Sequence, residues 1–206
     1  MKFPFWENTE SIKTTFIIIG SMILTLLLNI FFHEIGHSIP VLVSGGSIKR
    51  IVIFGIELIP DFGRNTHLGL IAFFSPSWYL GQATNNFWLG LMLFSGSGFT
   101  LLISYISIFS LWFCKVKRTL RLFLIVSSFH FLDILTYSFL PLLGFPHRLI
   151  VGSHNMEPVE GLMKMGLSKT SSLLLILILV CVAVYSISSF LKKHPTEVTI
   201  SVHDRF

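Results

Sequence analysis

The sequence predicts an all-α polytopic membrane protein, with about four transmembrane helices and a small membrane-associated β element after the first. Low charge and long apolar runs lead to this prediction. Only 12% of the 206 residues are charged, and the mean hydropathy is +0.77, whereas soluble domains carry about 25% charged residues. Lys and Arg flank the apolar runs and produce the net charge of +5. They are expected to contact lipid headgroups, so the bilayer is a predicted partner and nucleic acid is not.

Four apolar runs are long enough to cross a bilayer, which takes about 20 helical residues. They cover approximately residues 14–43, 87–113, 119–143 and 171–191. A shorter apolar run at 68–80 contains Pro76. It is expected to be re-entrant or interfacial, and a fifth span is the alternative. The tails are short, so we predict one membrane-embedded domain over 1–206, with its core at about 14–145 and an additional C-terminal span.

The segment 47–59 interrupts the helical pattern. It reads SIKRIVIFGIELI, follows Gly45-Gly46 and precedes Pro60, so it predicts a strand or hairpin. An exposed strand edge can hold an extended peptide by β-addition, and a simple hairpin at the membrane surface is the alternative. Glu57 within this segment is expected to be solvated. The polar segment 154–169 is expected to form a surface helix.

The first apolar run carries the sequence His33-Glu34-Ile35-Gly36-His37. On a helix the two histidines lie about 40° apart around the axis, so both imidazoles can reach one metal ion. Glu34 falls beside this face and suits a general base acting on water at the metal. Two histidines and a glutamate are costly at membrane depth and are usually found there because they have a function. We therefore predict that His33 and His37 bind Zn²⁺. Gly36 would allow another helix to approach closely.

Asp133 is the predicted third ligand, because a catalytic zinc site has three protein ligands. It lies within the apolar run LIVSSFHFLDILTYSFL, at about the depth of His37 when residues are counted from the span ends. A purely structural Asp that packs through His130 is the alternative. His130 itself has three open roles, which are orienting Asp133 or contacting substrate, structural support, and direct ligation. One polar stripe is expected to face the bundle: Ser127, His130, Asp133, Tyr137 and Ser138.

The other potential ligands show no suitable spacing. Cys114 and Cys181 form no C-x-x-C pair and are expected to be free thiols in the membrane. Five histidines are expected at the surface: His67, His147, His154, His194 and His203.

FFHEIGH in a transmembrane helix resembles the site-2 protease family of intramembrane zinc metalloproteases, and the resemblance covers roughly residues 14–145. In that family the HExxH helix is followed by a small β-rich segment, a helix with a Gly-Pro-x-x-Asn motif, and a helix with Leu-Asp-Gly. Here Gly96-Ser97-Gly98-Phe99-Thr100 lacks the Pro and the Asn, although Thr100 could donate a hydrogen bond. Leu132-Asp133-Ile134 lacks the final Gly. The chain would be a minimal, divergent member.

The resemblance implies a zinc-dependent endopeptidase that cuts a membrane protein or peptide within or next to a transmembrane segment. Zn²⁺ would be held by His33, His37 and Asp133, and Glu34 would be the general base. A regulatory partner or an oligomer is compatible with this interpretation. The alternative is a non-proteolytic, metal-binding membrane protein of the same fold that acts through partner binding. A transporter is less favoured, because the sequence has no repeated half and no paired broken helices.

Overall fold

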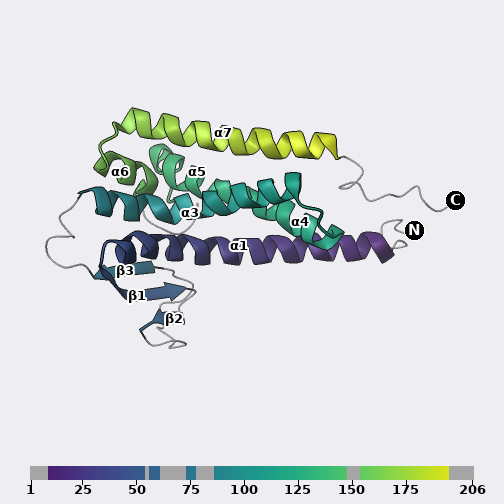
Figure 1. Cartoon of the computed structure of the whole chain (residues 1–206), viewed down its shortest axis with the longest axis horizontal. Helices are drawn as coiled ribbons and strands as arrows, with labels where there is room; N and C mark the ends of the chain where they lie inside the picture. Colours follow the sequence, from purple (N-terminus) through teal and green to yellow (C-terminus); the bar gives the residue numbers. More distant parts are fainter. Residues whose placement is uncertain (1–8, 54–55, 61–72, 78–85, 148–153, 195–206) are drawn as a thin grey trace.

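The apolar runs form long helices that lie side by side in the computed structural model (Figure 1). The structure describes residues 9–53, 56–60, 73–77, 86–147 and 154–194. Three helices are continuous: α1 (Thr9–Val43), α3 (Asn86–Phe113) and α7 (Lys169–Lys193). In Figure 1, α3 lies between α1 and α7.

All four predicted spans are confirmed as helices that are long and apolar enough to cross a membrane: Thr15–Val43, Asn86–Phe113, Arg118–Leu143 and Lys169–Lys193. Large apolar side chains such as Phe16, Leu26 and Phe113 are exposed on the outside of the bundle. A soluble monomer rarely exposes so much apolar surface, whereas lipid contact requires it. Cys114 and Cys181 are free and exposed, as expected.

The third span is built from short pieces. It consists of α4 (Arg118–Ser127), the 3₁₀ turn η2 (Ser128–Phe131), α5 (Leu132–Phe139) and the 3₁₀ turn η3 (Pro141–Leu143). The hydroxyl of Ser104 on α3 donates to the carbonyl of Ser128, which anchors η2 against α3. The predicted polar stripe is confirmed, because all five of its members are buried: Ser127, His130, Asp133, Tyr137 and Ser138.

The predicted β element follows α1 and is a three-stranded antiparallel sheet in the order β2-β1-β3. Its strands are β1 (Ser47–Ile53), β2 (Ile56–Ile59) and β3 (Phe73–Ser77). Because 73–77 pairs with β1, this part of the short apolar run is a strand and not a fifth membrane-spanning helix; 68–72 and 78–80 lie outside the described residues. The expectation of a solvated Glu57 is wrong. Its side chain is 2% exposed and pairs with Arg50 at 3.0 Å.

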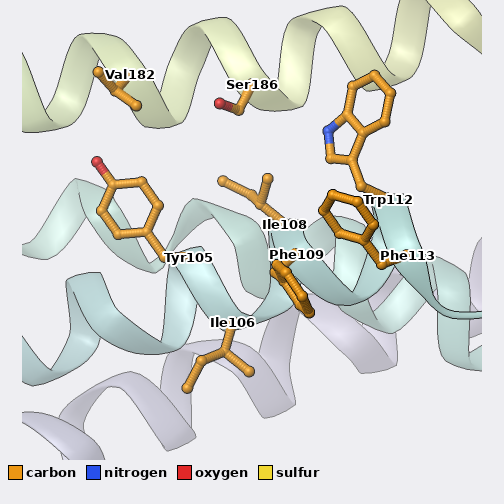
Figure 2. Close-up of a pocket in the computed structure, with 8 residues that line it drawn as sticks. All are labelled: Tyr105, Ile106, Ile108, Phe109, Trp112, Phe113, Val182 and Ser186. Atoms are coloured by element: carbon orange, nitrogen blue, oxygen red, sulfur yellow. The ribbon is translucent and has the colours of Figure 1, made fainter.

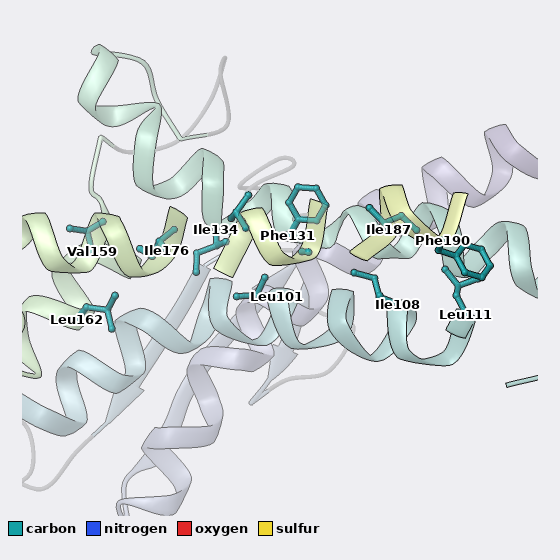
Figure 3. Packing of buried hydrophobic residues seen from close by; sticks show 12 residues of the cluster. Leu101, Ile108, Leu111, Phe131, Ile134, Val159, Leu162, Ile176, Ile187 and Phe190 are labelled. Atoms are coloured by element: carbon teal, nitrogen blue, oxygen red, sulfur yellow. The ribbon is translucent and has the colours of Figure 1, made fainter. Parts of the chain in front are cut away.

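Helix α6 (Glu157–Lys164) confirms a helix within 154–169, but it is not simply a surface helix. Val159 and Leu162 join the buried apolar cluster that also contains side chains of α3, α5 and α7 (Figure 3). The backbones of α3 and α6 touch, since a Cβ on Gly161 would lie 2.5 Å from the Gly90 carbonyl oxygen. The glycine pair therefore lets α6 dock closely on α3.

A four-span topology predicts that Cys114 and Asn155 lie on opposite sides of the membrane. The segment between them includes Arg118–Leu143, and 26 helical residues would extend about 39 Å, more than the hydrocarbon thickness of about 30 Å. Two single-cysteine proteins test this: Cys181→Ser alone, and Asn155→Cys with both native cysteines replaced by Ser. In sealed vesicles, a membrane-impermeant maleimide should label one without permeabilisation and the other only after it. Labelling of both from one side would contradict four spans.

Candidate metal centre

His33 and His37 lie one turn apart on α1 and are 2% and 6% exposed. Their Nε2 atoms are 3.2 Å apart, and the rings meet edge to face. Helix α3 lies directly against this turn, because a Cβ on Gly36 would be 2.8 Å from the Phe99 Cβ atom and 3.1 Å from the Gly96 Cα atom. The expected close approach at Gly36 is thus confirmed, and it shields the two imidazoles.

Each imidazole is oriented by a hydrogen bond from its outer nitrogen. Nδ1 of His33 lies 2.8 Å from Oδ2 of Asp133, and Nδ1 of His37 lies 2.7 Å from the Met92 carbonyl oxygen. A carboxylate and a carbonyl can only accept, so both Nδ1 atoms carry the proton. In a neutral ring Nε2 then carries a lone pair, and the two Nε2 atoms face each other at 3.2 Å. Two lone pairs at this separation suit a shared cation.

Glu157, the first residue of α6, brings a third potential ligand to the two histidines. Its Oε2 atom lies 3.6 Å from Nε2 of His33 and 3.7 Å from Nε2 of His37. Among the described residues these three side chains form a group whose ligand atoms lie close enough to hold one metal ion. Burial by itself raises the pKa of the Glu157 carboxyl, but His33, His37 and His147 outweigh it and leave the pKa below its usual value. Glu157 is not among the ligands that the sequence motifs indicate.

Asp133 contacts the outer side of the histidine pair. Besides Nδ1 of His33, its carboxylate accepts from Asn29 Nδ2 at 3.0 Å and from Thr100 Oγ1 at 3.1 Å. Thr100 is therefore close enough to act as the hydrogen-bond donor considered in the sequence analysis. The group of ligand atoms in the described part of the chain does not include Asp133. Its role as the third ligand stays a prediction.

His130 reaches Asp133 through Asn29, a residue of α1 that the sequence analysis did not single out. Nδ1 of His130 lies 2.6 Å from Oδ1 of Asn29, whose amide group donates to Asp133. An amide oxygen only accepts, so His130 donates. This places His130 in a chain of hydrogen bonds that orients Asp133 and, beyond it, His33.

Of the five histidines expected at the surface, His147 contradicts the expectation. It is 7% exposed and stacks on Tyr137 with ring centroids 4.0 Å apart, while Tyr137 lies 4.4 Å from the His33 ring. The stacked rings cover one side of the histidine pair. His154 is exposed as expected, and His194 is partly buried against Phe190. His67 and His203 lie outside the described residues.

Glu34 directly follows His33 on α1 and is buried with it, at 4% exposure. The described residues therefore bring together His33, Glu34 and His37 of the sequence motif, with Asp133 behind them. A separate apolar hollow lies between α3 and α7 (Figure 2). Tyr105 is the single titratable side chain among the residues that line it, and its hydroxyl donates to the Leu179 carbonyl. This hollow has none of the metal-centre residues.

Comparison with protein-family models, with curated proteins and with solved structures found no match to this chain. The resemblance to the site-2 protease family therefore rests on the sequence motifs, and the case for a function rests on the geometry of the metal centre.

Proposed function

We propose that this protein is a zinc-dependent intramembrane endopeptidase, which hydrolyses a peptide bond within or next to a transmembrane segment of a membrane-protein substrate. The observation that carries the proposal is the facing pair of Nε2 atoms on His33 and His37, each ring being held from behind by an acceptor at Nδ1. Histidine ligands of zinc usually have such an outer hydrogen bond. Glu34 adds the acid–base group that hydrolysis needs.

The donor atoms fit zinc. Bonds of about 2.0–2.2 Å in a tetrahedral arrangement put neighbouring ligand atoms about 3.3–3.5 Å apart. The three separations among Nε2 of His33, Nε2 of His37 and Oε2 of Glu157 are 3.2, 3.6 and 3.7 Å. Two imidazoles with one carboxylate are also a known ligand set of catalytic zinc.

Glu34, Met92 and Asp133 would each have a role in the reaction. Zinc, when bound, would polarise the scissile carbonyl and lower the pKa of the attacking water. Glu34 would take the proton from that water as its oxygen adds to the carbonyl carbon. Glu34 would then give the proton to the leaving nitrogen as the C–N bond breaks, leaving a free carboxyl group and an amine. Met92 and Asp133 would keep the imidazole nitrogens in the required orientation.

The sheet supports the proposal because a helical substrate must be extended before its carbonyls can be attacked. Strand β1 is the central strand and pairs on both edges, so a substrate strand would add to β2 or β3. The sheet follows α1 at its Val43 end, close in sequence to His37. We therefore propose that an extended segment bound to the sheet would be passed along α1 to the metal centre.

Zinc removal tests the proposal. The purified full chain, in liposomes with a single-span reporter substrate, should contain about one zinc per chain and cleave the reporter. A chelator should abolish cleavage, and stoichiometric zinc should restore it. His37→Ala should lose zinc and cleavage, whereas His154→Ala, at an exposed position, should keep both. Cleavage at the wild-type rate by zinc-free protein would contradict the proposal.

A further inference from the structure

The geometry points to Glu157 of α6 as the third protein ligand of the metal, with Asp133 as the residue that positions His33. This inference rests on the proposed metal site and replaces the carboxylate that the sequence motifs favour. It assigns a ligand to a short helix outside the four spans, so the site would be completed by an element that docks on the bundle.

Asp133 and Glu157 reach opposite sides of the imidazoles. Asp133 contacts Nδ1 of His33, the nitrogen that carries the proton. Glu157 lies within 3.7 Å of Nε2 on both histidines, where the two Nε2 atoms converge. A metal shared by both rings must lie on the Nε2 side, so Glu157 is the carboxylate that faces it.

The two carboxylates also differ in the hydrogen bonds that they already accept. The Asp133 carboxylate already accepts from His33, Asn29 and Thr100. By contrast, Oε2 of Glu157 is buried and has no hydrogen-bond partner among the described residues. A buried carboxylate oxygen without a hydrogen-bond donor lowers the stability of the folded protein, and a bound cation would compensate for this cost.

Helix α6, which carries Glu157, is held firmly in place. Gly161 packs on the backbone of α3, where its Cβ would lie 2.5 Å from the Gly90 carbonyl oxygen and 2.6 Å from the Phe94 amide nitrogen. Val159 and Leu162 are buried in the shared apolar cluster. These contacts fix the first turn of α6, and Glu157 is its first residue. The ligand would thus be presented by a docked helix and not by a free loop.

The test compares Glu157→Gln with Asp133→Asn, and with Glu160→Gln as a matched change on the exposed side of the same helix. Zinc affinity is measured by chelator competition on the full-length protein, and the ligand field by the visible absorption of the Co²⁺-substituted form. Asp133→Asn should weaken zinc about 10- to 100-fold, as loss of an outer hydrogen-bond partner does, and leave the cobalt bands near their wild-type positions. Glu157→Gln should weaken zinc further and shift the bands. Glu160→Gln should match wild type.

Glu157→His covers the case in which the Gln variant folds poorly, because histidine is itself a zinc ligand. It should bind zinc more tightly than Glu157→Gln, and equal affinities would overturn the assignment. The assignment is also overturned if Glu157→Gln binds zinc as Glu160→Gln does, or if Asp133→Asn suffers the larger loss. A wild type that holds zinc through Glu157 but cleaves no reporter would refute the proposed protease function and leave the ligand assignment standing.

Discussion

Glu34→Gln is expected to lose about 10²- to 10⁴-fold in cleavage of a membrane substrate, the usual contribution of a general acid–base group, while zinc stays near one per chain. Glu34 directly follows His33 and shares its buried environment, yet it is not part of the ligand group formed by the described residues. Glutamine has the same size but cannot take a proton. Zinc content by mass spectrometry and cleavage rate on the same preparation give the two readings.

Glu160→Gln is the matched control, since it makes the same change on the exposed side of α6. Cleavage at the wild-type rate by a zinc-loaded Glu34→Gln protein would contradict the general-base role. The experiment also separates the two functions that the sequence allows. A protein that only binds metal and a partner would show no cleavage in the wild type, and Glu34→Gln would then leave its properties unchanged.

The helices could be predicted from the sequence because the signal for a membrane span is local. About 20 consecutive apolar residues suffice, whatever they pack against. The predicted fourth span, 171–191, differs from α7 (Lys169–Lys193) by two residues at each end. Ser168, directly before α7, caps the helix by accepting from the Ser171 amide, and the two additional residues at the other end are Lys192 and Lys193.

The features that depend on pairing between distant segments could not be predicted in the same way. An isolated carboxylate in a sequence is usually exposed to solvent, but the pairing of β1 with β2 places Glu57 against Arg50. Similarly, 73–77 lies in an apolar run expected to be re-entrant or interfacial, and it forms a strand because it pairs with β1. His147 has no local signal, and only the fold stacks it on Tyr137.

Glu157 is the residue of the candidate site that sequence reasoning missed. A metal at membrane depth is expected to take its ligands from the spans, and Asp133 and His130 are the candidates in the apolar run of the third span. Glu157 instead lies in a polar segment and reaches the histidines because α6 docks on α3 through Gly90 and Gly161. A signal was present, since Pro158 near a helix start, followed by Val159 and Leu162, indicates a short helix with one buried face.

Gly96→Ala is expected to lower zinc affinity by at least about 10- to 100-fold, which is the loss that follows removal of a hydrogen-bond partner behind a histidine ligand. The cleavage rate at subsaturating zinc should fall accordingly. A Cβ at Gly96 would lie 2.5 Å from Nε2 and Cε1 of His37 and 3.0 Å from Nε2 of His33. No real Cβ tolerates such contacts, so the two rings must turn or α3 must move away from α1. Either movement breaks the arrangement of ligand atoms. Chelator competition measures the loss of affinity.

Gly20→Ala is the matched control, because Gly20 lies in α1 and its Cβ would meet nothing within 4 Å. Alanine favours a helix over glycine at both positions, so neither change should weaken the helices themselves. The Gly20 variant should therefore bind zinc as wild type does, and thermal unfolding with excess chelator should show both variants folded. If Gly96→Ala bound zinc within about twofold of Gly20→Ala, the imidazoles would not lie against α3 as described. A His37 ring that turned away from Gly96 at so little cost would also not be held by the Met92 carbonyl oxygen, as the proposed metal site requires.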